Sequence, residues 1–323
     1  MTKRARIIYN PTSGREAIRR DLVDILNVYE SAGYETSAFA TTPEENSAQD
    51  EALRAAQDGF ELIVAAGGDG TINEVVNGVA ALDNPPMLAV IPAGTTNDYA
   101  RALHIPRDSP LEAAEVILKG RAARMDIGMA NDNYFVNIAA GGSLSELTYS
   151  VPSKQKSMYG YLAYVVKAAE MLPQSHQMDI EVEYDDGVYR GPASMFLLAL
   201  TNSVGGFEQL VPDAQLDDGN FTLLVVKTTK LNELLVLVKE AFQGKHVDDD
   251  NLLYVKSSKV KITPLPENDA PIPINLDGEY GGDAPMTFVN HRALLTMVTG
   301  IDENIEKNPF TQDIIEIDTK VND

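Results

Sequence analysis

The sequence contains no cysteine among its 323 residues, which excludes disulfide bonds, thiolate nucleophiles and zinc–thiolate sites. This absence is typical of proteins in a reducing cytoplasm. No apolar run reaches the roughly 18 residues of a membrane-spanning helix. The first residues also lack the apolar core of a signal peptide, because Met1–Arg6 leads directly into a predicted strand. We therefore expect a soluble, cytoplasmic protein.

Positive charge is scarce, since 26 Lys and Arg residues face 48 Asp and Glu residues, for a net charge of −22. Nucleic acid is not an expected partner, because its binding requires clustered Lys and Arg. The acidic balance also argues against strong attraction of the whole chain to an anionic membrane. The four histidines are scattered along the sequence and indicate no metal cluster.

The first 125 residues alternate between predicted strands and helices. The strands are expected at residues 6–9, 34–40, 62–66 and 88–91, and the helices at 17–32, 48–57 and 111–119. This order predicts a doubly wound α/β domain, with a largely parallel sheet and helices on both faces. Ligands of such domains bind beyond the carboxyl ends of the strands.

Short strands dominate residues 126–290, which predicts a mainly antiparallel β-sandwich as the second domain. The strands are expected at 134–139, 178–184, 194–201, 221–226, 260–263 and 272–276, and two helices at 160–172 and 231–243. Residues 291–310 are expected to pack back on the first domain, and residues 311–323 to form an acidic tail with at most a short helix.

The most informative motif is Gly67-Gly68-Asp69-Gly70-Thr71, which follows the apolar run 62–66 and opens a helical pattern. Glycines let a ligand approach the backbone closely, and a helix N-terminus presents unpaired N–H groups to phosphate. Asp69 would repel phosphates unless a cation lay between them, so it indicates Mg²⁺ carried by a nucleotide. The motif predicts a kinase.

Two other turns strengthen this interpretation. Asn10–Gly14 follows the first strand, and Pro92–Asp98 follows the strand at 88–91 with the same order of glycine, hydroxyl groups and a carboxylate. Either turn alone is explained by ordinary helix capping. Together with the first motif they indicate a nucleotide site in which Asp69 and Asp98 hold Mg²⁺ or position an acceptor hydroxyl.

The motifs taken together resemble those of soluble bacterial diacylglycerol kinases, which belong to a lipid-kinase superfamily with sphingosine and ceramide kinases. The resemblance is carried by residues 67–74, 94–98, 139–142, 216–219 and 276–279, in this order along the chain. The glycine motif alone is less specific, because NAD kinases and phosphofructokinases have a similar one.

The resemblance implies that ATP is a co-substrate and that the active site lies in the cleft between the two domains. The implied ATP contacts are Asn10, Pro11, Thr12, Ser13, Gly14, Thr41, Gly67, Gly68, Asp69, Gly70, Thr71, Ile72, Asn73 and Thr95. Glu279 is implied as the proton acceptor for the lipid hydroxyl, with Asp277 beside it and Asp69 and Asp98 as further catalytic residues. Taken alone, Asp277–Gly282 would be a hairpin turn with surface acids.

The resemblance also implies a structural Mg²⁺ site in the loop 215–220. Its protein ligands would be the Asp218 carboxylate and the main-chain carbonyls of Gln215 and Asn220. Oxygen ligands of this kind suit a hard cation. The alternative interpretation is a common Asp-Gly turn between two strands.

Residues 153–157 and the aromatic helix after them could rest on a bilayer, through Lys154 and Lys156, and guide a lipid into the site. A core-facing helix with solvated lysines explains the same pattern. Arg15 and Lys167 are candidate contacts for phosphate or lipid headgroups. We expect a transient, peripheral association with the inner face of the membrane, and the resemblance implies a homodimer.

The sequence therefore predicts an ATP- and Mg²⁺-dependent kinase that converts diacylglycerol to phosphatidic acid. One alternative is a kinase for another hydroxyl substrate, such as a sphingoid base, a glycolipid or NAD. The other is a module that binds nucleotide or lipid without turnover. The absence of a Thr-Gly-Ser-Thr-type motif disfavours NAD, and the presence of Asp69, Asp98 and Glu279 disfavours the non-catalytic module.

Overall fold

The computed structural model describes residues 2–142, 177–203, 210–227, 230–241, 245–268, 270–301, 314–317 and 319. The chain divides into two units. Unit 1 comprises Met1–Ile127, Leu216–Asp218 and Arg292–Asp323, and unit 2 comprises Gly128–Gln215 and Gly219–His291. The helix predicted at 160–172 and the candidate headgroup contacts Lys154, Lys156 and Lys167 lie outside the described residues, as does the side chain of Arg15.

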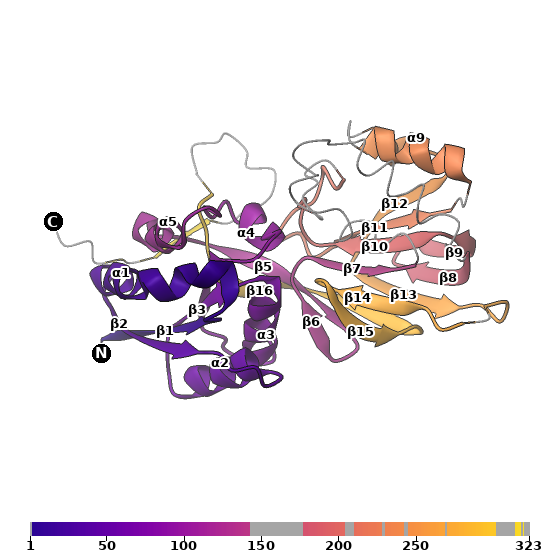
Figure 1. Cartoon of the computed structure of the whole chain (residues 1–323). Coiled ribbons are helices and arrows are strands. Elements are labelled where there is room, and N and C mark those ends of the chain that lie inside the picture. The colour runs from indigo at the N-terminus through magenta and orange to yellow at the C-terminus, as the bar shows by residue number, and fades with distance from the viewer. Residues whose placement is uncertain are drawn as a thin grey trace. The chain divides into compact units, whose positions relative to one another are not determined.

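Unit 1 is built on a parallel sheet with the strand order β2-β1-β3-β4-β16 (Figure 1). The strands are β1 (Lys3–Tyr9), β2 (Tyr34–Ala40), β3 (Leu62–Gly67), β4 (Met87–Pro92) and the second half of β16 (Met286–Val298). Every residue of β3 is buried, as expected of a central strand covered on both faces.

Helices cover both faces of this sheet: α1 and α5 lie on one face and α2 and α3 on the other (Figure 1). The elements are η1 (Ser13–Glu16), α1 (Ala17–Ser31), α2 (Ser47–Gln57), α3 (Asp69–Val79), α4 (Asp98–Ala102), α5 (Pro110–Glu115) and η2 (Val116–Lys119). The helix predicted at 111–119 is thus α-helical only to Glu115 and ends as a 3-10 helix. The predicted α/β arrangement is confirmed.

Helices α2 and α3 pack closely because α3 carries a glycine at the contact. A Cβ atom placed on Gly78 would lie 2.4 Å from the carbonyl oxygen of Gln49 and 3.0 Å from the Cβ of Ala52. Only a residue without a side chain allows this approach. The close packing joins the last turn of α3 to the first turns of α2.

Two further strands, β5 (Arg121–Ala130) and β17 (Ile314–Glu316), are not expected from the sequence, and β5 begins in unit 1 and ends in unit 2. β5 pairs through Arg121–Ala123 with β17, which lies within the predicted acidic tail. The three residues of β17 are too few for a recognisable alternating pattern. The conformation of β17 is therefore determined by its pairing with β5, almost 200 positions earlier in the chain. This part of the tail is therefore a strand and not a helix.

Unit 2 is a sandwich of two antiparallel layers, which confirms the predicted class of the second domain. One layer has the order β12-β11-β10-β7-β14-β15 and the other the order β16-β13-β8-β9. The strands are β7 (Ile138–Gly141), β8 (Met178–Tyr184), β9 (Gly187–Ala193), β10 (Met195–Ala199), β11 (Phe221–Val226), β12 (Leu252–Ser257), β13 (Lys259–Pro264), β14 (Pro273–Leu276) and β15 (Glu279–Asp283).

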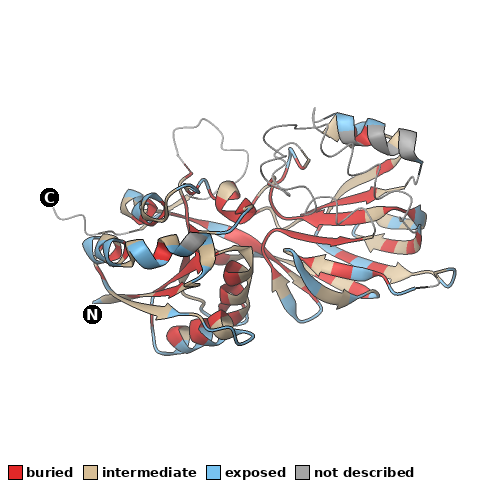
Figure 2. Ribbon diagram, viewed as in Figure 1, coloured by how far each residue is buried: buried red, intermediate tan, exposed pale blue. Residues whose placement is uncertain are grey.

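The core of unit 2 lies between its two layers and contains four buried phenylalanines. Phe135 stacks on Phe221 at a centroid distance of 5.7 Å and meets Phe288 edge-on at 6.3 Å. Along β8 and β13 buried residues alternate with more exposed ones (Figure 2). One face of each strand therefore supplies this core. Helix α9 (Leu231–Ala241) covers the outer face of the other layer through Leu237.

The sequence predicts one strand at 134–139, whereas the structure contains β6 (Asn133–Phe135) and β7 with a break between them. The break occurs because the amides of Val136, Asn137 and Ile138 all donate to the carboxylate of Asp277 instead of to a neighbouring strand. A local pattern does not reveal an acceptor so distant in the sequence.

Within the described residues, no helix is both long enough and apolar enough to cross a membrane.

His246 is a buried titratable group in unit 2, within η4 (His246–Asp248). Its Nε2 lies 2.9 Å from the carbonyl oxygen of Leu210, so Nε2 carries the hydrogen and donates it. The Nδ1 atom is buried and has no partner among the described residues. Burial lowers the pKa of His246, although the Leu210 carbonyl and the carboxylates of Glu240 and Asp213 act in the opposite direction.

We predict that His246 makes the fold sensitive to acid. Its folded-state pKa lies below the value of about 6.5 in an unfolded chain. The unfolded chain therefore binds the proton first as the pH falls, and stability is lost below about pH 6.5. The His246→Gln variant should lose less thermal stability than the wild type between about pH 7.5 and about pH 5.5.

Melting curves at several pH values test this prediction. The His104→Gln variant, which changes an exposed histidine of unit 1, should keep the wild-type pH dependence. Equal acid sensitivity of His246→Gln and the wild type would exclude a contribution of His246.

Candidate active site

Three loops that follow parallel strands of unit 1 contact one another at the carboxyl ends of these strands. The amide of Asn10, after β1, donates to the carbonyl of Ala66 in β3 at 2.9 Å. The amide of Ala93, after β4, donates to the carbonyl of Gly67 at 2.7 Å. The sequence-predicted turns 10–14, 67–73 and 92–98 are therefore brought together at one edge of the sheet.

The loops approach so closely that glycine is required at their contact. A Cβ atom on Gly94 would lie 2.9 Å from the Cα of Gly68 and 2.8 Å from the Oδ1 of Asn97. A Cβ atom on Gly67 would lie 2.5 Å from the Oγ1 of Thr71. Two backbones thus meet directly, with no side chain between them.

Asp69 is held in place by the neighbouring loop. Its Oδ2 atom accepts a hydrogen bond of 2.9 Å from the Oγ1 of Thr96. Gly68 precedes α3 without a side-chain cap, so the first N–H groups of this helix are not bonded by a capping side chain. The start of α3 therefore offers both a fixed carboxylate and the donors that favour an anion.

Asn97 shapes the second glycine turn. It has a left-handed conformation with φ of 51°, accepts a hydrogen bond from the Gly94 amide at 2.8 Å and donates one to the Gly94 carbonyl at 3.1 Å. Asp98 follows it as the first residue of α4 and is buried. Asn97 and Thr96 were not among the residues expected to form the site, although the polar run Thr95–Asp98 contains both.

The loop after β1 is organised by Asn10. Its Oδ1 atom accepts hydrogen bonds from the amide of Thr12 at 3.0 Å and from the Thr12 hydroxyl at 2.8 Å. Gly14 has φ of 58°, and a Cβ atom there would lie 3.1 Å from the Cβ of Ala93. Thr41 begins the loop after β2 and is tied to β1, since its amide donates to the Tyr9 carbonyl at 2.9 Å.

Glu74 follows the glycine motif on α3 and contacts a neighbouring helix. Glu74 accepts a hydrogen bond of 2.9 Å from the amide of Ala48 at the start of α2. It therefore caps a neighbouring helix, where a carboxylate also interacts favourably with the helix dipole. This contact gives Glu74 a structural role in unit 1.

In unit 2, Asp277 and Gly278 form a two-residue hairpin turn between β14 and β15. Both residues have positive φ, 50° and 105°, as a tight antiparallel hairpin requires. The Asp277 carboxylate accepts the amides of Val136 at 2.7 Å, Asn137 at 2.8 Å and Ile138 at 2.9 Å. Asp277 thus joins the hairpin to the segment between β6 and β7.

Glu279 is the first residue of β15, directly after this turn, and its side chain is exposed. The Glu279 side chain makes no hydrogen bond or ion pair with the described residues. An exposed carboxylate at the end of a rigid turn is free to meet an incoming hydroxyl group. The hairpin alternative and the catalytic interpretation of this motif are compatible, because the turn positions the acid.

The loop 215–220 is anchored through its backbone. The Leu216 carbonyl accepts the amide of Asp126 at 2.6 Å, and the Asp217 carbonyl accepts the Nε of Arg292 at 3.0 Å. Asp126 in turn accepts the Ala293 amide at 2.7 Å. Gly219 has φ of 82°, which matches the Asp-Gly turn that the sequence indicates. The predicted ligand Asp218 lies within this fixed turn.

The donor chemistry of unit 1 fits a magnesium ion that arrives with a nucleotide. Mg²⁺ is usually held by one or two carboxylates together with phosphate oxygens and water. Asp69 and Asp98 supply two carboxylates, as the first residues of α3 and α4. The part of the chain that the structure describes contains no cluster of three or more His, Asp or Glu side chains suited to a metal ion.

Family models match both units. The model of the diacylglycerol kinase catalytic domain matches residues 4–130, which include all three loops of unit 1. The model of the YegS C-terminal NAD kinase beta sandwich-like domain matches residues 147–299, which include the Asp277 hairpin.

Curated proteins and a solved structure resemble the whole chain. The diacylglycerol kinase of Bacillus subtilis (strain 168) is 52% identical over 291 residues, which cover 89% of this chain and 93% of that protein. The diacylglycerol kinase of Staphylococcus epidermidis (strain RP62A) is 47% identical over 319 residues, or 99% and 97% of the two chains. The crystal structure of a diacylglycerol kinase from Bacillus anthracis str. Sterne has the same fold, with a TM-score of 0.74 at 24% identity, and covers 93% of this chain and 97% of its own.

We predict that the Asp277→Asn variant is less stable than the wild type. An asparagine side chain offers one oxygen where three amides need an acceptor, and it turns a donor group toward one of them. Hydrogen bonds to a charged group contribute about 1.5–3 kcal/mol each, so we expect a loss of at least about 1.5 kcal/mol in the free energy of unfolding.

Chemical denaturation measures this loss. The Asp283→Asn variant, which changes the exposed last residue of β15, is the matched control and should change stability by less than about 0.5 kcal/mol. An Asp277→Asn variant as stable as this control would show that the three amide contacts do not stabilise the hairpin.

Proposed function

The chain belongs to the diacylglycerol kinase family, and on this premise we propose that it transfers the γ-phosphate of ATP to the free hydroxyl group of diacylglycerol, which yields phosphatidic acid and ADP. The observation that carries the proposal is the contact of three strand-end loops around Gly68 and Gly94. The identity of about half of all residues to two curated diacylglycerol kinases over nearly the full chain supports the same activity.

The loops of unit 1 bind the nucleotide in this proposal. The first N–H groups of α3, directly after Gly68, donate to phosphate oxygens, and the turn 10–14 and Thr41 bind other parts of ATP. Phosphoryl transfer depends mainly on positioning and on neutralisation of the phosphate charge. The contribution of Thr96 is to hold the Asp69 carboxylate in one orientation before the substrate binds.

Asp69 and Asp98 are the residues that would hold Mg²⁺ together with the phosphates of ATP. When bound, this ion neutralises the charge of the transferred group. The structural Mg²⁺ site at Asp218, with the carbonyls of Gln215 and Asn220, is a separate part of the proposal. It is supported by the anchored backbone of this turn, which would present fixed oxygen ligands.

Glu279 is the proposed general base. Its carboxylate accepts the proton of the diacylglycerol hydroxyl as the oxygen attacks the γ-phosphorus, and the bond between the β,γ-bridging oxygen and the γ-phosphorus breaks. Asp277 acts as a positioning residue, because its carboxylate binds three backbone amides and holds the turn that precedes Glu279.

The acceptor lipid places the enzyme at a membrane surface during turnover. We propose a transient, peripheral association with the inner face of the membrane, and a homodimer as the assembled form. Support for both comes from the nature of the substrate and from membership in the family, since the overall charge of −22 would oppose a general attraction to anionic lipid.

The choice of acceptor is tested directly with purified enzyme. Labelled ATP is incubated with dispersed diacylglycerol, sphingosine, ceramide or NAD, with and without Mg²⁺. The proposal predicts labelled phosphatidic acid only when Mg²⁺ is present. NAD is included because the matched domain of unit 2 is described as NAD kinase-like, and preferential labelling of NAD would overturn the assignment.

We predict that the Glu279→Gln variant lowers kcat by about 10²- to 10⁴-fold, because glutamine keeps the shape of the side chain but cannot accept the proton. The affinity for ATP and the melting temperature should stay close to those of the wild type, since the Glu279 side chain is exposed and makes no hydrogen bond or ion pair with the described residues. Initial rates and nucleotide titrations measure these effects.

The control for this variant is Glu267→Gln, which neutralises another exposed glutamate of unit 2. This control should retain wild-type turnover. A Glu279→Gln variant with near-normal kcat would remove Glu279 from the role of the base without affecting the assignment of ATP to unit 1.

A further inference from the structure

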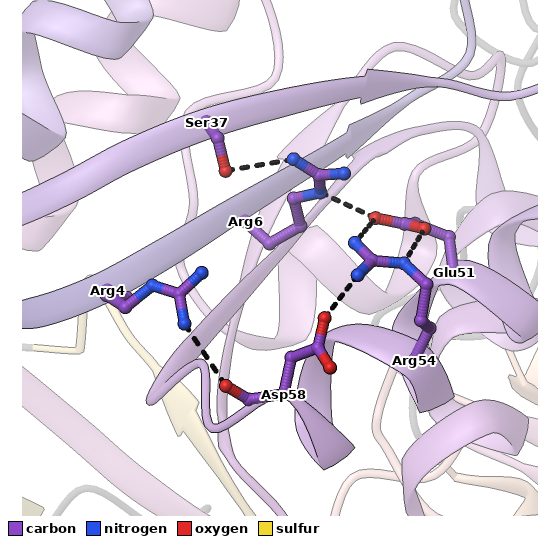
Figure 3. A network of polar contacts seen from close by, with 6 residues as sticks. All are labelled: Arg4, Arg6, Ser37, Glu51, Arg54 and Asp58. Atoms are coloured by element: carbon purple, nitrogen blue, oxygen red, sulfur yellow. Dashed lines mark hydrogen bonds and ion pairs between the residues drawn. The ribbon is translucent and has the colours of Figure 1, made fainter.

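Unit 1 contains a pocket of about 280 Å³ that the proposed reaction does not use. Its walls include Arg4, Arg6, Ser37, Arg54 and Asp58, which are drawn in Figure 3, and also Phe60. Arg4 and Arg6 occupy the second and fourth positions of β1, whereas the nucleotide loop follows its last residue, Tyr9. The pocket therefore belongs to the amino-terminal half of the strand and is a separate feature of unit 1.

One side of the pocket is a charge-balanced network. Arg54 donates to the two carboxylate oxygens of Glu51 at 2.7 Å and 2.8 Å, and to the carboxylate of Asp58. Arg6 donates to Glu51 at 2.6 Å and to the hydroxyl of Ser37 at 2.9 Å. Although burial acts to raise the pKa of Glu51, the hydrogen bonds from Arg54 and Arg6 hold it below its ordinary value, so Glu51 stays ionised.

Arg4 adds a positive charge that this network does not neutralise. Its guanidinium group lies over the ring of Phe60, 3.9 Å from the centroid, and its Nη1 atom donates to the main-chain carbonyl of Asp58 at 3.1 Å. No ion pair joins Arg4 to a carboxylate of the described residues. Glu35 of β2 is the register partner of Arg4 in β1, and it is an exposed residue at the edge of the pocket.

The guanidinium groups keep donors that the protein does not use. Arg4 makes no further hydrogen bond to the described residues, and the Nη2 atom of Arg6 makes none. The ring of Phe60 and the carboxylate of Glu51 hold the two groups in place. Because the Ser37 oxygen accepts from Arg6, its hydrogen is available for donation.

From this geometry we propose that the pocket is a binding site for a phosphate-type oxyanion. Planar guanidinium groups match the geometry of phosphate oxygens, and their preorganisation reduces the entropy lost on binding. A tetrahedral anion has enough oxygens to accept from Arg4, Arg6 and Ser37 together. The source of the anion is either free phosphate or the phosphate group of a phospholipid, which share this chemistry.

The chain offers a clean optical test because it contains no tryptophan. In the Phe60→Trp variant the single indole ring lies beside Arg4 and reports on this pocket alone, whatever occupies the nucleotide loops. Titration with inorganic phosphate should change the emission in a saturable way, and sodium chloride at equal ionic strength should not. Absence of a saturable change with every phosphate source would overturn the proposal.

Substitutions define which residues bind the anion. Adding Arg4→Met to the reporter variant should weaken binding about tenfold or more, as expected for the loss of a charge-assisted contact. Arg107→Met, which removes an exposed arginine elsewhere in unit 1, should leave it unchanged. Glu35→Gln should strengthen binding about two- to fivefold, because a rim carboxylate no longer repels the anion. Equal affinities of the Arg4→Met and Arg107→Met variants would contradict the assignment.

A second measurement avoids any change at Phe60. With the native ring, phosphate should raise the melting temperature of Arg107→Met more than that of Arg4→Met.

Vesicles of phosphatidylcholine with and without phosphatidic acid distinguish free phosphate from a lipid phosphate group as the source of the anion. A response of the reporter to inorganic phosphate assigns a soluble ligand, and a response only to phosphatidic acid assigns a lipid headgroup. These readouts involve no kinase activity, so their outcome is independent of the proposed function.

Discussion

Amide groups at the strand ends of this chain are bound by specific acceptors, and these bonds shape the candidate residues of unit 1 and, separately, those of unit 2. In unit 1 the amide of Ala93 binds the carbonyl of Gly67, so that two loops meet backbone to backbone. In unit 2 the carboxylate of Asp277 takes the place of a neighbouring strand for three consecutive amides. The requirement that backbone polar groups be paired therefore positions the glycine loops of unit 1 and the turn before Glu279.

The parts of the fold that the sequence predicts are those determined by local patterns. The strand at Leu62–Gly67 follows from an uninterrupted apolar run that ends in glycine, and the helix after it follows from 3.6-residue periodicity. The glycine turns 67–71 and 92–98 were recognisable for the same reason, because each carries its structural requirement within a few residues. Their meeting at one edge of a parallel sheet follows from the alternation of strands and helices.

Features that depend on distant partners could not be predicted. The break between β6 and β7 is caused by Asp277, about 140 positions further along the chain, and β17 exists only because β5 offers it an edge. The hydrogen bond from the Thr96 hydroxyl to Asp69 joins two loops, so no local pattern reveals it. Likewise, Arg4 and Phe60 are unremarkable in the sequence, and only the stacking of one on the other creates a fixed cation.

Strand β16 has a consequence for the order in which the chain folds during synthesis. Its residues up to His291 belong to unit 2, and those from Arg292 onward belong to unit 1, where Met297 pairs with Leu88 of β4. A growing chain emerges from the ribosome with its N-terminus first. Strands β1–β4 are therefore synthesised before their fifth neighbour, the second half of β16, which is translated after all of unit 2. The open edge of β4 is exposed during this interval, and the N-terminal sheet is completed only after unit 2 has been translated.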